Sequence, residues 1–324
     1  MVRVSSGAMS QMPHFVKPML AKLSALPVDE SQWAFEVKWD GIRAIARYEA
    51  GRLKLLSRNE IDRAARYPEL AMLGEALGSH SAMLDGEIVT FDEQGRPSFQ
   101  GLAEHDAPGA RQASYMIFDL LWLDGESLLD LPYLERRERL LALELGGDRV
   151  KVPAHYVGEG TALLAASREQ DLEGIVAKHL DSPYVPGGRR GEWMKIKNVS
   201  SQELVIGGWL PGKKGRSGRL GALLVGHYEP GEDHTPVLRY AGGVGTGFTD
   251  RELERLGKKL HARARKTSPF VGTQPPREAR FVRPDLVAEI EFREWTRDGS
   301  LRHPSYKGLR EDKNAREVVR ERPV

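Results

Sequence analysis

The sequence predicts an α+β protein of two domains, an antiparallel-sheet domain over residues 15–201 and a small β-barrel of the OB type over residues 202–324. A chain of 324 residues is longer than one ordinary hydrophobic core supports. Up to about residue 202 strand-like and helix-like segments alternate, whereas beyond it short strands and glycine-rich turns dominate. We expect residues 1–14 to be a disordered N-terminus and the domain boundary to lie near Asn198–Glu203.

The elements of the first domain follow from the spacing of apolar residues. Short segments with alternating apolar and polar residues, or short apolar runs, predict strands. These segments are residues 33–38, 42–49, 52–57, 82–91, 115–123, 173–179 and 192–198, and we expect the strand at 115–123 to be buried. Helical spacing occurs at residues 131–145 and at residues 67–78, where Pro68 suits a first helical turn.

The second domain is predicted to contain several short strands and one helix. The strand-like segments are residues 203–210, 222–228, 237–245 and 286–296. Thr249, with Glu252 three residues later, matches a capping box and marks the start of a helix over residues 248–264. The proline-rich stretch 267–284 is expected to be a loop.

Composition excludes several classes of protein. The sequence contains no cysteine, so disulfides, a thiol nucleophile and a cysteine-ligated zinc site are excluded. No apolar run approaches the ~20 residues that span a bilayer, and the first residues lack the apolar core of a signal peptide. We therefore expect a cytoplasmic protein with no membrane partner.

Charge is divided unevenly along the chain. Residues 203–324 contain 24 Lys and Arg against 17 Asp and Glu, a net charge of +7, whereas the remainder carries −5. A basic C-terminal part suits a polyanionic partner. A well-solvated basic surface accounts for the same numbers.

The hexapeptide KWDGIR, residues 38–43, places a lysine at a strand end beside an aspartate and a glycine. A nucleophilic lysine has to lose its proton, which from a pKa of ~10.4 requires burial or nearby cations. Lys195 and Lys197, two apart on a predicted strand, share one face and could supply those cations while binding a phosphate. An ordinary solvated strand face explains each segment alone.

Other segments suggest further parts of a site. Glu87 in DGE and Glu173 in EGIVAK lie at strand ends and could hold Mg²⁺ or Mn²⁺, although surface ion pairs would look the same. Phe118 in FDL could stack on a base or belong to the core. Arg58 in SRN could bind phosphate or sit in a turn. The basic segment at residues 302–313 could clamp a polyphosphate or be a solvated tail.

A rival signal is GGWLPGKK at residues 207–214, which nearly matches a phosphate-binding P-loop. Lys214 stands where serine or threonine is required, and the following residues read as a turn into a strand instead of a helix. A barrel hairpin is the better interpretation.

The order of these segments is more specific than any one of them. KWDGIR, SRN, DGE, FDL, EGIVAK and WMKIK resemble the six nucleotidyltransferase motifs of ATP-dependent DNA ligases and mRNA capping enzymes. RHPSYKGLREDK resembles the closing motif on the OB domain of that superfamily, and its wording is most similar to the ligase domain of bacterial end-joining enzymes of the ligase D type. The resemblance covers the chain from about Phe15 onward.

The resemblance implies an antiparallel-sheet nucleotidyltransferase (adenylation) domain in which Lys38 takes AMP from ATP, passes it to a 5′-phosphate at a nick, and lets the 3′-OH seal the strand. It also implies roles for the individual residues. Glu36 would contact adenine, and Phe118 would stack on it. Glu87 would hold the ribose and a metal ion, and Glu173 would hold the same metal. Lys195 and Lys197 would bind the α-phosphate. Asp40, Arg43 and Arg58 would serve the nick, and Arg310, Asp312 and Lys313 would orient pyrophosphate after the OB domain closes over ATP.

The resemblance further implies partners: nicked or broken double-stranded DNA, the end-binding protein Ku, and other end-joining repair proteins at the bacterial nucleoid. We expect a monomer. Whether the chain stands alone or is one domain of a larger repair enzyme is open. The alternatives are an RNA ligase, a GTP-using capping-type nucleotidyltransferase, and a non-catalytic OB-type nucleic-acid binding protein.

Overall fold

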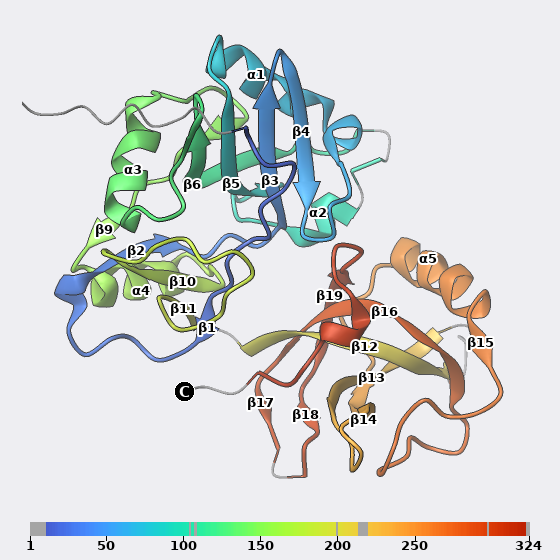
Figure 1. Cartoon of the computed structure of the whole chain (residues 1–324). Coiled ribbons are helices and arrows are strands. Elements are labelled where there is room, and N and C mark those ends of the chain that lie inside the picture. Colours follow the sequence, from blue (N-terminus) through green and yellow to red (C-terminus); the bar gives the residue numbers. More distant parts are fainter. Residues whose placement is uncertain are drawn as a thin grey trace, which may run out of the picture. The chain divides into compact units, whose positions relative to one another are not determined.

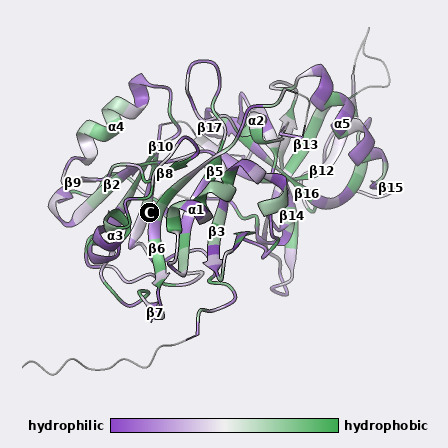
Figure 2. Cartoon of the chain, turned by 90° about the horizontal axis from the view of Figure 1, so that it is seen from above, coloured by the Kyte–Doolittle hydropathy of each residue, from purple (hydrophilic) through white to green (hydrophobic). Residues whose placement is uncertain are grey.

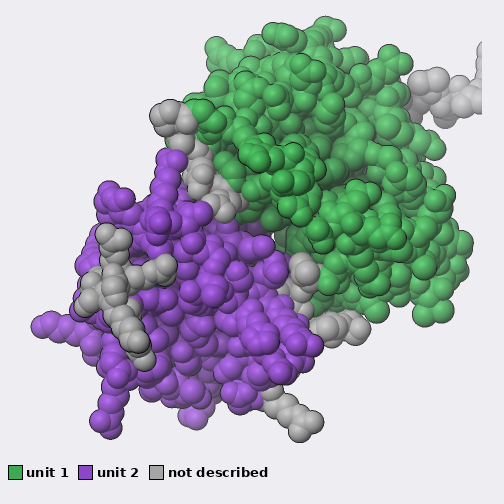
Figure 3. All heavy atoms as spheres, turned by 180° about the vertical axis from the view of Figure 1, so that it is seen from behind, with its two compact units in different colours: residues 1–198, 323–324 green, residues 199–322 purple. Residues whose placement is uncertain are grey.

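The computed structural model describes residues 11–103, 105–106, 109–198, 200–212, 220–296 and 298–321. The chain divides into two compact units, Met1–Asn198 with Pro323–Val324, and Val199–Arg322, which are coloured separately in Figure 3. The division falls within the range Asn198–Glu203 that the change of sequence texture indicated, three residues before position 202. Most of the N-terminal segment expected to be disordered, residues 1–10, lies outside the described residues.

The first unit contains a six-stranded sheet with the order β4-β3-β5-β6-β7 and β8 on β6, visible in the upper part of Figure 1. All its pairs are antiparallel except the parallel pair of β6 with β8. Its strands are β3 (Ile42–Glu49), β4 (Arg52–Ser57), β5 (Ala82–Val89), β6 (Ser114–Leu123), β7 (Glu126–Ser127) and β8 (Val150–Lys151). Strand β6 is buried along nearly its whole length, as its apolar run predicted.

A second, five-stranded sheet in this unit has the order β1-β11-β10-β2-β9. Its strands are β1 (Lys22–Leu23), β2 (Trp33–Val37), β9 (Tyr156–Val157), β10 (Gly174–His179) and β11 (Trp193–Lys197). The short β1 pairs in parallel with β11, and the other pairs are antiparallel. The two sheets carry the segments that resemble the nucleotidyltransferase motifs on neighbouring strands.

In the described part of the first unit, four helices and three 3-10 turns accompany the two sheets. The first unit has α1 (Met72–Leu77), α2 (Phe99–Ala103), α3 (Tyr133–Ala142) and α4 (Gly160–Glu169), with 3-10 turns η1 (Glu30–Gln32), η2 (Ala64–Arg66) and η3 (Pro68–Ala71). The helix predicted at residues 67–78 is thus a 3-10 turn that begins at Pro68, followed by α1. Hydrophobic residues are concentrated in the strands, as the green segments of Figure 2 show.

The two sheets of the first unit share a core between them. Ile45 and Phe118 from the six-stranded sheet pack in one buried cluster with Trp193 of β11. Met12 and Met19 from the N-terminal segment belong to the same cluster, and both are buried. The packed part of the unit therefore begins before Phe15, because the apolar residues of this segment fill the space between the sheets.

The second unit is built on a six-stranded antiparallel sheet with the order β14-β13-β12-β16-β15 and β19 on β16. Its elements are β12 (Ser200–Pro211), β13 (Leu220–Pro230), β14 (Pro236–Val244), α5 (Asp250–His261), β15 (Ala264–Arg265), β16 (Arg280–Phe292), the hairpin β17 (Glu294–Trp295) and β18 (Leu301–Arg302), β19 (Ser305–Leu309) and η5 (Ala315–Glu317). The predicted fold class, an antiparallel-sheet domain followed by a small OB-type domain, is confirmed.

Helix α5 begins at the residue that its capping signal predicted. Thr249 is the N-cap, and its hydroxyl accepts a hydrogen bond from Glu252 N at 3.2 Å. The Glu252 carboxylate does not complete the box, because Tyr306 of β19 donates its hydroxyl to it at 2.6 Å. Glu252, which would otherwise complete the N-terminal cap, therefore links α5 to strand β19.

Two further expectations concern loops of the second unit. The loop predicted at residues 267–284 is wrong at its end, since β16 already begins at Arg280 and includes Pro284. Pairing of β12 with β16 shifts register beside this proline, whose missing N–H is tolerated at such an irregularity. The P-loop rival is replaced by antiparallel strands β12 and β13, with Pro211 opposite Leu220, while Lys213 and Lys214 lie outside the described residues.

Candidate active site

Lys38 lies directly after β2 and continues the pairing of that strand. Its backbone N–H donates to Gly174 O at 3.0 Å, and Gly174 pairs with Lys197 of β11. Cross-strand neighbours point to the same face of a sheet, so Lys38 and Lys197 flank Gly174 on one face. Glu36 and Lys195, each two residues earlier on its strand, face the same side. The structure thus brings the three predicted lysines together.

Glu173 joins this group through its carboxylate. One carboxylate oxygen forms an ion pair with Lys38 Nζ, and the other lies 3.3 Å from Lys197 Nζ. Burial alone would raise the pKa of Glu173, but Lys38 and then Lys197 hold that pKa at about 2. Glu173 is therefore a carboxylate at neutral pH, positioned between two of the lysines.

The ionisation of Lys38 differs from the sequence-based expectation. Burial and the charge of Lys197 would lower the pKa of Lys38, but the carboxylate of Glu173, helped by Asp40, raises it above its ordinary value. The neighbouring cations are visible in the sequence, whereas the carboxylate that outweighs them comes from Glu173 on another strand end. Lys38 in this state is an ammonium ion, and Glu173 has to release it before it can act as a nucleophile.

Gly174 is required by the local backbone. Its φ is +148°, and a Cβ at this position would lie 2.1 Å from Ile196 O of the neighbouring strand. No larger residue fits without moving β10 away from β11. Because Glu173 precedes this glycine and Lys197 pairs with it, the close strand approach fixes the carboxylate beside the lysines.

Arg43 and Glu87 face each other across β3 and β5 of the other sheet. The Arg43 guanidinium donates two hydrogen bonds to Asp85, Nε to Oδ1 at 2.5 Å and a terminal nitrogen to Oδ2 at 2.6 Å. Asp85 is fully buried, and Tyr184 donates its hydroxyl to the same carboxylate at 2.6 Å. The aspartate of the DGE segment therefore orients Arg43, while the side chain of Glu87 is half-buried beside it.

Phe118 is predicted to stack on a base, and its ring is 7% exposed. The Arg43 guanidinium lies 4.6 Å and Lys178 Nζ 4.4 Å from the centre of this ring, and Trp193 packs edge-on against it. The ring lies in the core between the two sheets, which agrees with the core reading of the sequence. A base that stacks there has to displace one of these contacts.

Glu36 is held by two buried partners. Lys178 Nζ donates to both carboxylate oxygens at 2.9 Å, and the Tyr133 hydroxyl donates to Oε1 at 2.5 Å. Burial lowers the pKa of Lys178, and Glu36 opposes this effect. Tyr133 was not recognised in the sequence, because a tyrosine in the first turn of an amphipathic helix reads as a core residue. Lys178 stood in EGIVAK without a role.

Asp119, the second residue of FDL, belongs to the scaffold. Its carboxylate accepts two hydrogen bonds from Arg136 of α3, at 2.8 and 2.9 Å, and both side chains are fully buried. Arg136 also donates to Ser182 O at 3.0 Å. This pair fixes α3, and with it Tyr133, against β6. No sequence pattern distinguishes a buried ion pair such as this one from an ion pair on the surface.

Two residues assigned to the nick lie at the edges of this region. Asp40 follows Lys38 in the turn into β3 and is half-buried. Arg58 is half-buried and directly follows Ser57 of β4, which pairs with Ala44, so the same register continued by one residue brings Arg58 opposite Arg43. Both residues lie just outside the strands, Asp40 before β3 and Arg58 after β4.

Arg310, Asp312 and Lys313 belong to the second unit, where they form their own charged group. Arg310 donates two hydrogen bonds of 3.0 Å to Asp312 and lies 3.4 Å from Glu289, and all three side chains are buried. Lys313 forms a partly exposed ion pair with Glu203 at 2.7 Å. In this state Arg310 and Asp312 serve the core of their unit, and Lys313 is the more accessible of the predicted pyrophosphate contacts.

The chemistry of the carboxylates suits a hard divalent cation. Within the described residues no group of three or more His, Asp or Glu side chains is arranged to hold a metal ion. Glu87 and Glu173, from the two sheets, offer oxygen ligands of the type that Mg²⁺ takes when it keeps waters and binds phosphates. Glu87 and Glu173 are the carboxylates that would hold such a cation, and the cation would supply positive charge to phosphate oxygens.

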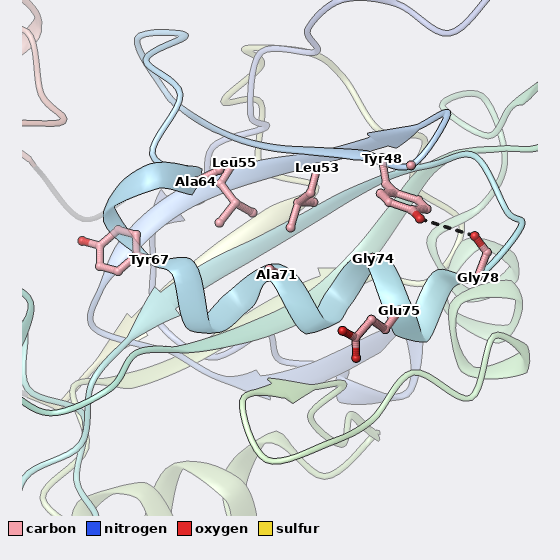
Figure 4. A pocket seen from close by; sticks show the side chains of 10 residues that line it. Tyr48, Leu53, Leu55, Ala64, Tyr67, Ala71, Gly74, Glu75 and Gly78 are labelled. Carbon is pink, nitrogen blue, oxygen red and sulfur yellow. Dashed lines mark hydrogen bonds between the residues drawn. The ribbon is translucent and has the colours of Figure 1, made fainter.

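A separate pocket of about 530 Å³ opens on the outer face of the six-stranded sheet (Figure 4). Tyr48 and Leu55 line it from β3 and β4, and Tyr67 and Gly74 from the helical segment that crosses them. These side chains belong to the outer core of the unit, on the face away from Arg43 and Asp85. The pocket therefore takes no part in the site around Lys38.

Comparisons with known families match nearly the whole chain. The family described as "ATP dependent DNA ligase domain" matches residues 18–197, and "ATP dependent DNA ligase C terminal region" matches residues 216–313. No helix in the described part of the chain is long and apolar enough to span a membrane.

Individual relatives agree with the family matches. The multifunctional non-homologous end joining DNA repair protein LigD of Mycobacterium tuberculosis is 42% identical over 308 residues, 94% of this chain and 40% of that protein. LigD of Mycolicibacterium smegmatis is 44% identical over 95% of this chain and 40% of its own length. LigD of Pseudomonas aeruginosa is 40% identical over 99% of this chain and 38% of its own length. The chain thus spans about two fifths of these relatives.

Among solved structures, "mycobacterial DNA ligase D complexed with ATP and MES" is similar with a TM-score of 0.70 and 40% identity, covering 94% of this chain and 98% of the other. The ligase domain of Mycobacterium tuberculosis LigD is similar with a TM-score of 0.54, at the same identity and coverage.

Proposed function

Since this chain belongs to the family of ATP-dependent DNA ligases, we propose that it seals nicks in DNA through a covalent AMP adduct on Lys38. The observation that carries the proposal is the row of Lys38, Gly174 and Lys197 with Glu173 beside it. A nucleophilic amine, cations for a phosphate and a carboxylate that controls the amine then lie on one sheet face.

In the first step, the Lys38 ammonium loses one proton to solvent, and the neutral Nζ attacks the α-phosphate of ATP and loses a second proton as the new bond forms. The new bond is a phosphoramidate between nitrogen and phosphorus, and the bond from the α-phosphate to pyrophosphate breaks. Lys195 and Lys197 offset the charge on the α-phosphate oxygens. Glu173 holds Lys38 protonated and positioned until ATP binds, so it controls when the amine becomes reactive. A divalent cation bound by Glu87 and Glu173 would supply positive charge to the phosphates.

In the second step, an oxygen of the 5′-phosphate at a nick attacks the phosphorus of AMP, the nitrogen–phosphorus bond breaks, and Lys38 leaves as an amine. In the third step, the 3′-OH loses its proton to solvent, attacks the 5′-phosphate and expels AMP. We assign Asp40, Arg43 and Arg58 to the nick. The bidentate pair of Arg43 with Asp85 supports this, because it presents an oriented guanidinium beside Glu87. A guanidinium in fixed geometry matches phosphate oxygens better than a flexible ammonium does.

The base is assigned to Glu36 and Phe118. Glu36 lies two residues before Lys38 and faces the same side of the sheet, and the Phe118 ring lies against Lys178, the partner of Glu36. ATP is the proposed nucleotide, since a carboxylate accepts from the amine of adenine. A GTP-using capping-type activity and an RNA ligase activity are the alternatives within this fold.

We further propose that Lys313, with Arg310 and Asp312, orients pyrophosphate, and that the substrate is nicked or broken DNA at the bacterial nucleoid, with Ku as a partner in end joining. The basic excess of +7 over residues 203–324 supports binding through backbone phosphates. Affinity should then fall with salt, with log affinity changing by ~0.9 per phosphate contacted for each unit of log salt. Little sequence preference is expected, because phosphate contacts carry none.

The direct test is sealing of a labelled nicked duplex by the purified chain with Mg²⁺ or Mn²⁺ and ATP. A ligated strand, formed with ATP and not with GTP, is the expected result. Ligation only when the 3′ side of the nick is RNA would favour the RNA ligase alternative. Transfer of GMP without any ligation would favour the capping type. Binding of DNA without nucleotide transfer would favour the non-catalytic alternative.

A further inference from the structure

Glu36 is an unusual base-reading residue because most of its acceptor capacity is already used. A carboxylate offers about four lone-pair sites on two oxygens. Oε1 accepts from the Tyr133 hydroxyl at 2.5 Å and from Lys178 Nζ at 2.9 Å, which fills that oxygen. Oε2 accepts from Lys178 at 2.9 Å and keeps one site. Three of the four sites are thus occupied by protein donors.

The donors are fixed in place. Lys178 is 1% and Tyr133 0% exposed, and Glu36 itself is 4% exposed. Lys178 Nζ lies between 4.3 and 5.0 Å from the ring centres of Trp193, Phe118 and Tyr133, and it lies 3.4 Å from Phe118 O. Tyr133 is held through α3, which the buried pair of Arg136 with Asp119 ties to β6. None of these groups can turn away without leaving a buried polar atom unpaired.

The number of free acceptors matters for the choice between purine bases. Adenine presents one amine donor, N6, next to the acceptor nitrogen N1. One carboxylate oxygen can accept from N6, whereas a second free oxygen would face N1 and repel it. Guanine presents two adjacent donors, N1–H and the N2 amine, and its O6 is an acceptor. A carboxylate with both oxygens free pairs with those two donors, whereas a carboxylate with a single free site does not.

We propose that Tyr133 and Lys178 determine nucleotide specificity by occupying Oε1 of Glu36, which leaves a single acceptor that suits adenine and denies guanine its second contact. The inference rests on the proposed function, in which Glu36 faces the base of a nucleoside triphosphate. It assigns to Tyr133 and Lys178 a positioning role that acts through Glu36. The choice between ATP and GTP is then set by the two residues that bind Glu36, Tyr133 and Lys178, as well as by the carboxylate of Glu36 itself.

The test is the ratio of kcat/KM for self-labelling with α-labelled ATP and with α-labelled GTP. Tyr133→Phe removes the hydroxyl and keeps the ring, and it should lower the ATP-to-GTP ratio by about tenfold, mainly through a lower KM for GTP, because one acceptor site is freed. Lys178→Met, which frees sites on both oxygens, should lower the ratio further. A ratio is insensitive to the folded fraction, since unfolded molecules reduce both rates equally.

Tyr115→Phe is the matched control. The Tyr115 hydroxyl is also buried and donates to Ala44 O at 2.8 Å, in the outer core of the same unit. Its loss should leave the ratio unchanged. Ratios within twofold of the wild type for both Tyr133→Phe and Lys178→Met would overturn the inference. A wild-type protein that takes no label from either nucleotide would instead overturn the proposed function.

Discussion

Replacing Arg310 by alanine should destabilise the second unit strongly. In the folded protein Arg310 forms two 3.0 Å hydrogen bonds with Asp312 and an ion pair with Glu289, and the exposed fractions are 8% for Arg310 and 2% for Asp312. Removing the cation takes the guanidinium away from two buried carboxylates. Breaking one side of such a buried pair costs about 3–5 kcal/mol.

Lys313→Ala provides the comparison. Lys313 pairs with Glu203 at 2.7 Å, but about a fifth of each side chain is exposed, so its loss should cost only about 0–1 kcal/mol. The assay is thermal unfolding followed by intrinsic tryptophan fluorescence, to which Trp209 and Trp295 of the second unit contribute. For a unit of this size, about 3–5 kcal/mol corresponds to a fall in Tm of roughly 10–20 °C.

The outcome separates a structural role from a direct one. If Lys313→Ala melts near the wild type and loses self-adenylylation, then Lys313 contacts the nucleotide. If Arg310→Ala melts within about 2 °C of the wild type, the buried ion pair does not stabilise the second unit as its burial implies, and that inference is refuted.

Four other predictions concern the lysine site and the DNA. The pKa of Glu173 is held at about 2 against an ordinary 4.5, so its ionised form stabilises the folded protein above pH 4.5, and that contribution of about 3 kcal/mol is lost as the pH falls toward 2. The free energy of unfolding of Glu173→Gln in urea should therefore depend on pH less than that of the wild type between pH 4.5 and 2. Equal pH dependence of the two proteins would contradict the ion pair. In the same variant the pKa of Lys38 should fall, so that mass spectrometry detects its modification by an amine reagent at lower pH than in the wild type, and an unchanged profile would refute the coupling. Gly174→Ala, whose Cβ would lie 2.1 Å from Ile196 O, should abolish self-labelling, and a fully active variant would show that β10 can move freely. Finally, double-strand end joining by the chain alone should be weak and salt-sensitive and should improve with cognate Ku. Sealing of single nicks should proceed without Ku. Efficient end joining at high salt without Ku would reveal a DNA clamp.

The sequence predicts the parts of this protein that depend on local pattern. The alternating segments around Lys38 and Lys195 are strands, and the lysines share a face because strand periodicity leaves no other choice. The cap at Thr249 is likewise visible in four consecutive residues. The order of the motifs, more than any one of them, identified the family.

What the sequence did not predict depends on contacts between distant residues. Glu173 is 135 positions from Lys38, and Tyr133 is 97 positions from Glu36, so their pairing appears only when the sheets form. The raised pKa of Lys38 was missed for this reason, since the spacing of Lys195 and Lys197 reveals two cations but not the carboxylate of Glu173 that lies between Lys38 and Lys197. Arg310 and Asp312 show the reverse case, because a charged C-terminal segment reads as exposed although both side chains are buried.

The central claim is that Lys38 carries AMP, and the most direct measurement is to incubate the protein with α-labelled ATP and locate the label. The account predicts one acid-labile phosphoramidate, mapped by mass spectrometry of the digested protein to the peptide that contains Lys38, and no label on Lys38→Ala. Undiminished labelling of Lys38→Ala, or an adduct on Lys195 or Lys197 in the wild type, would contradict it.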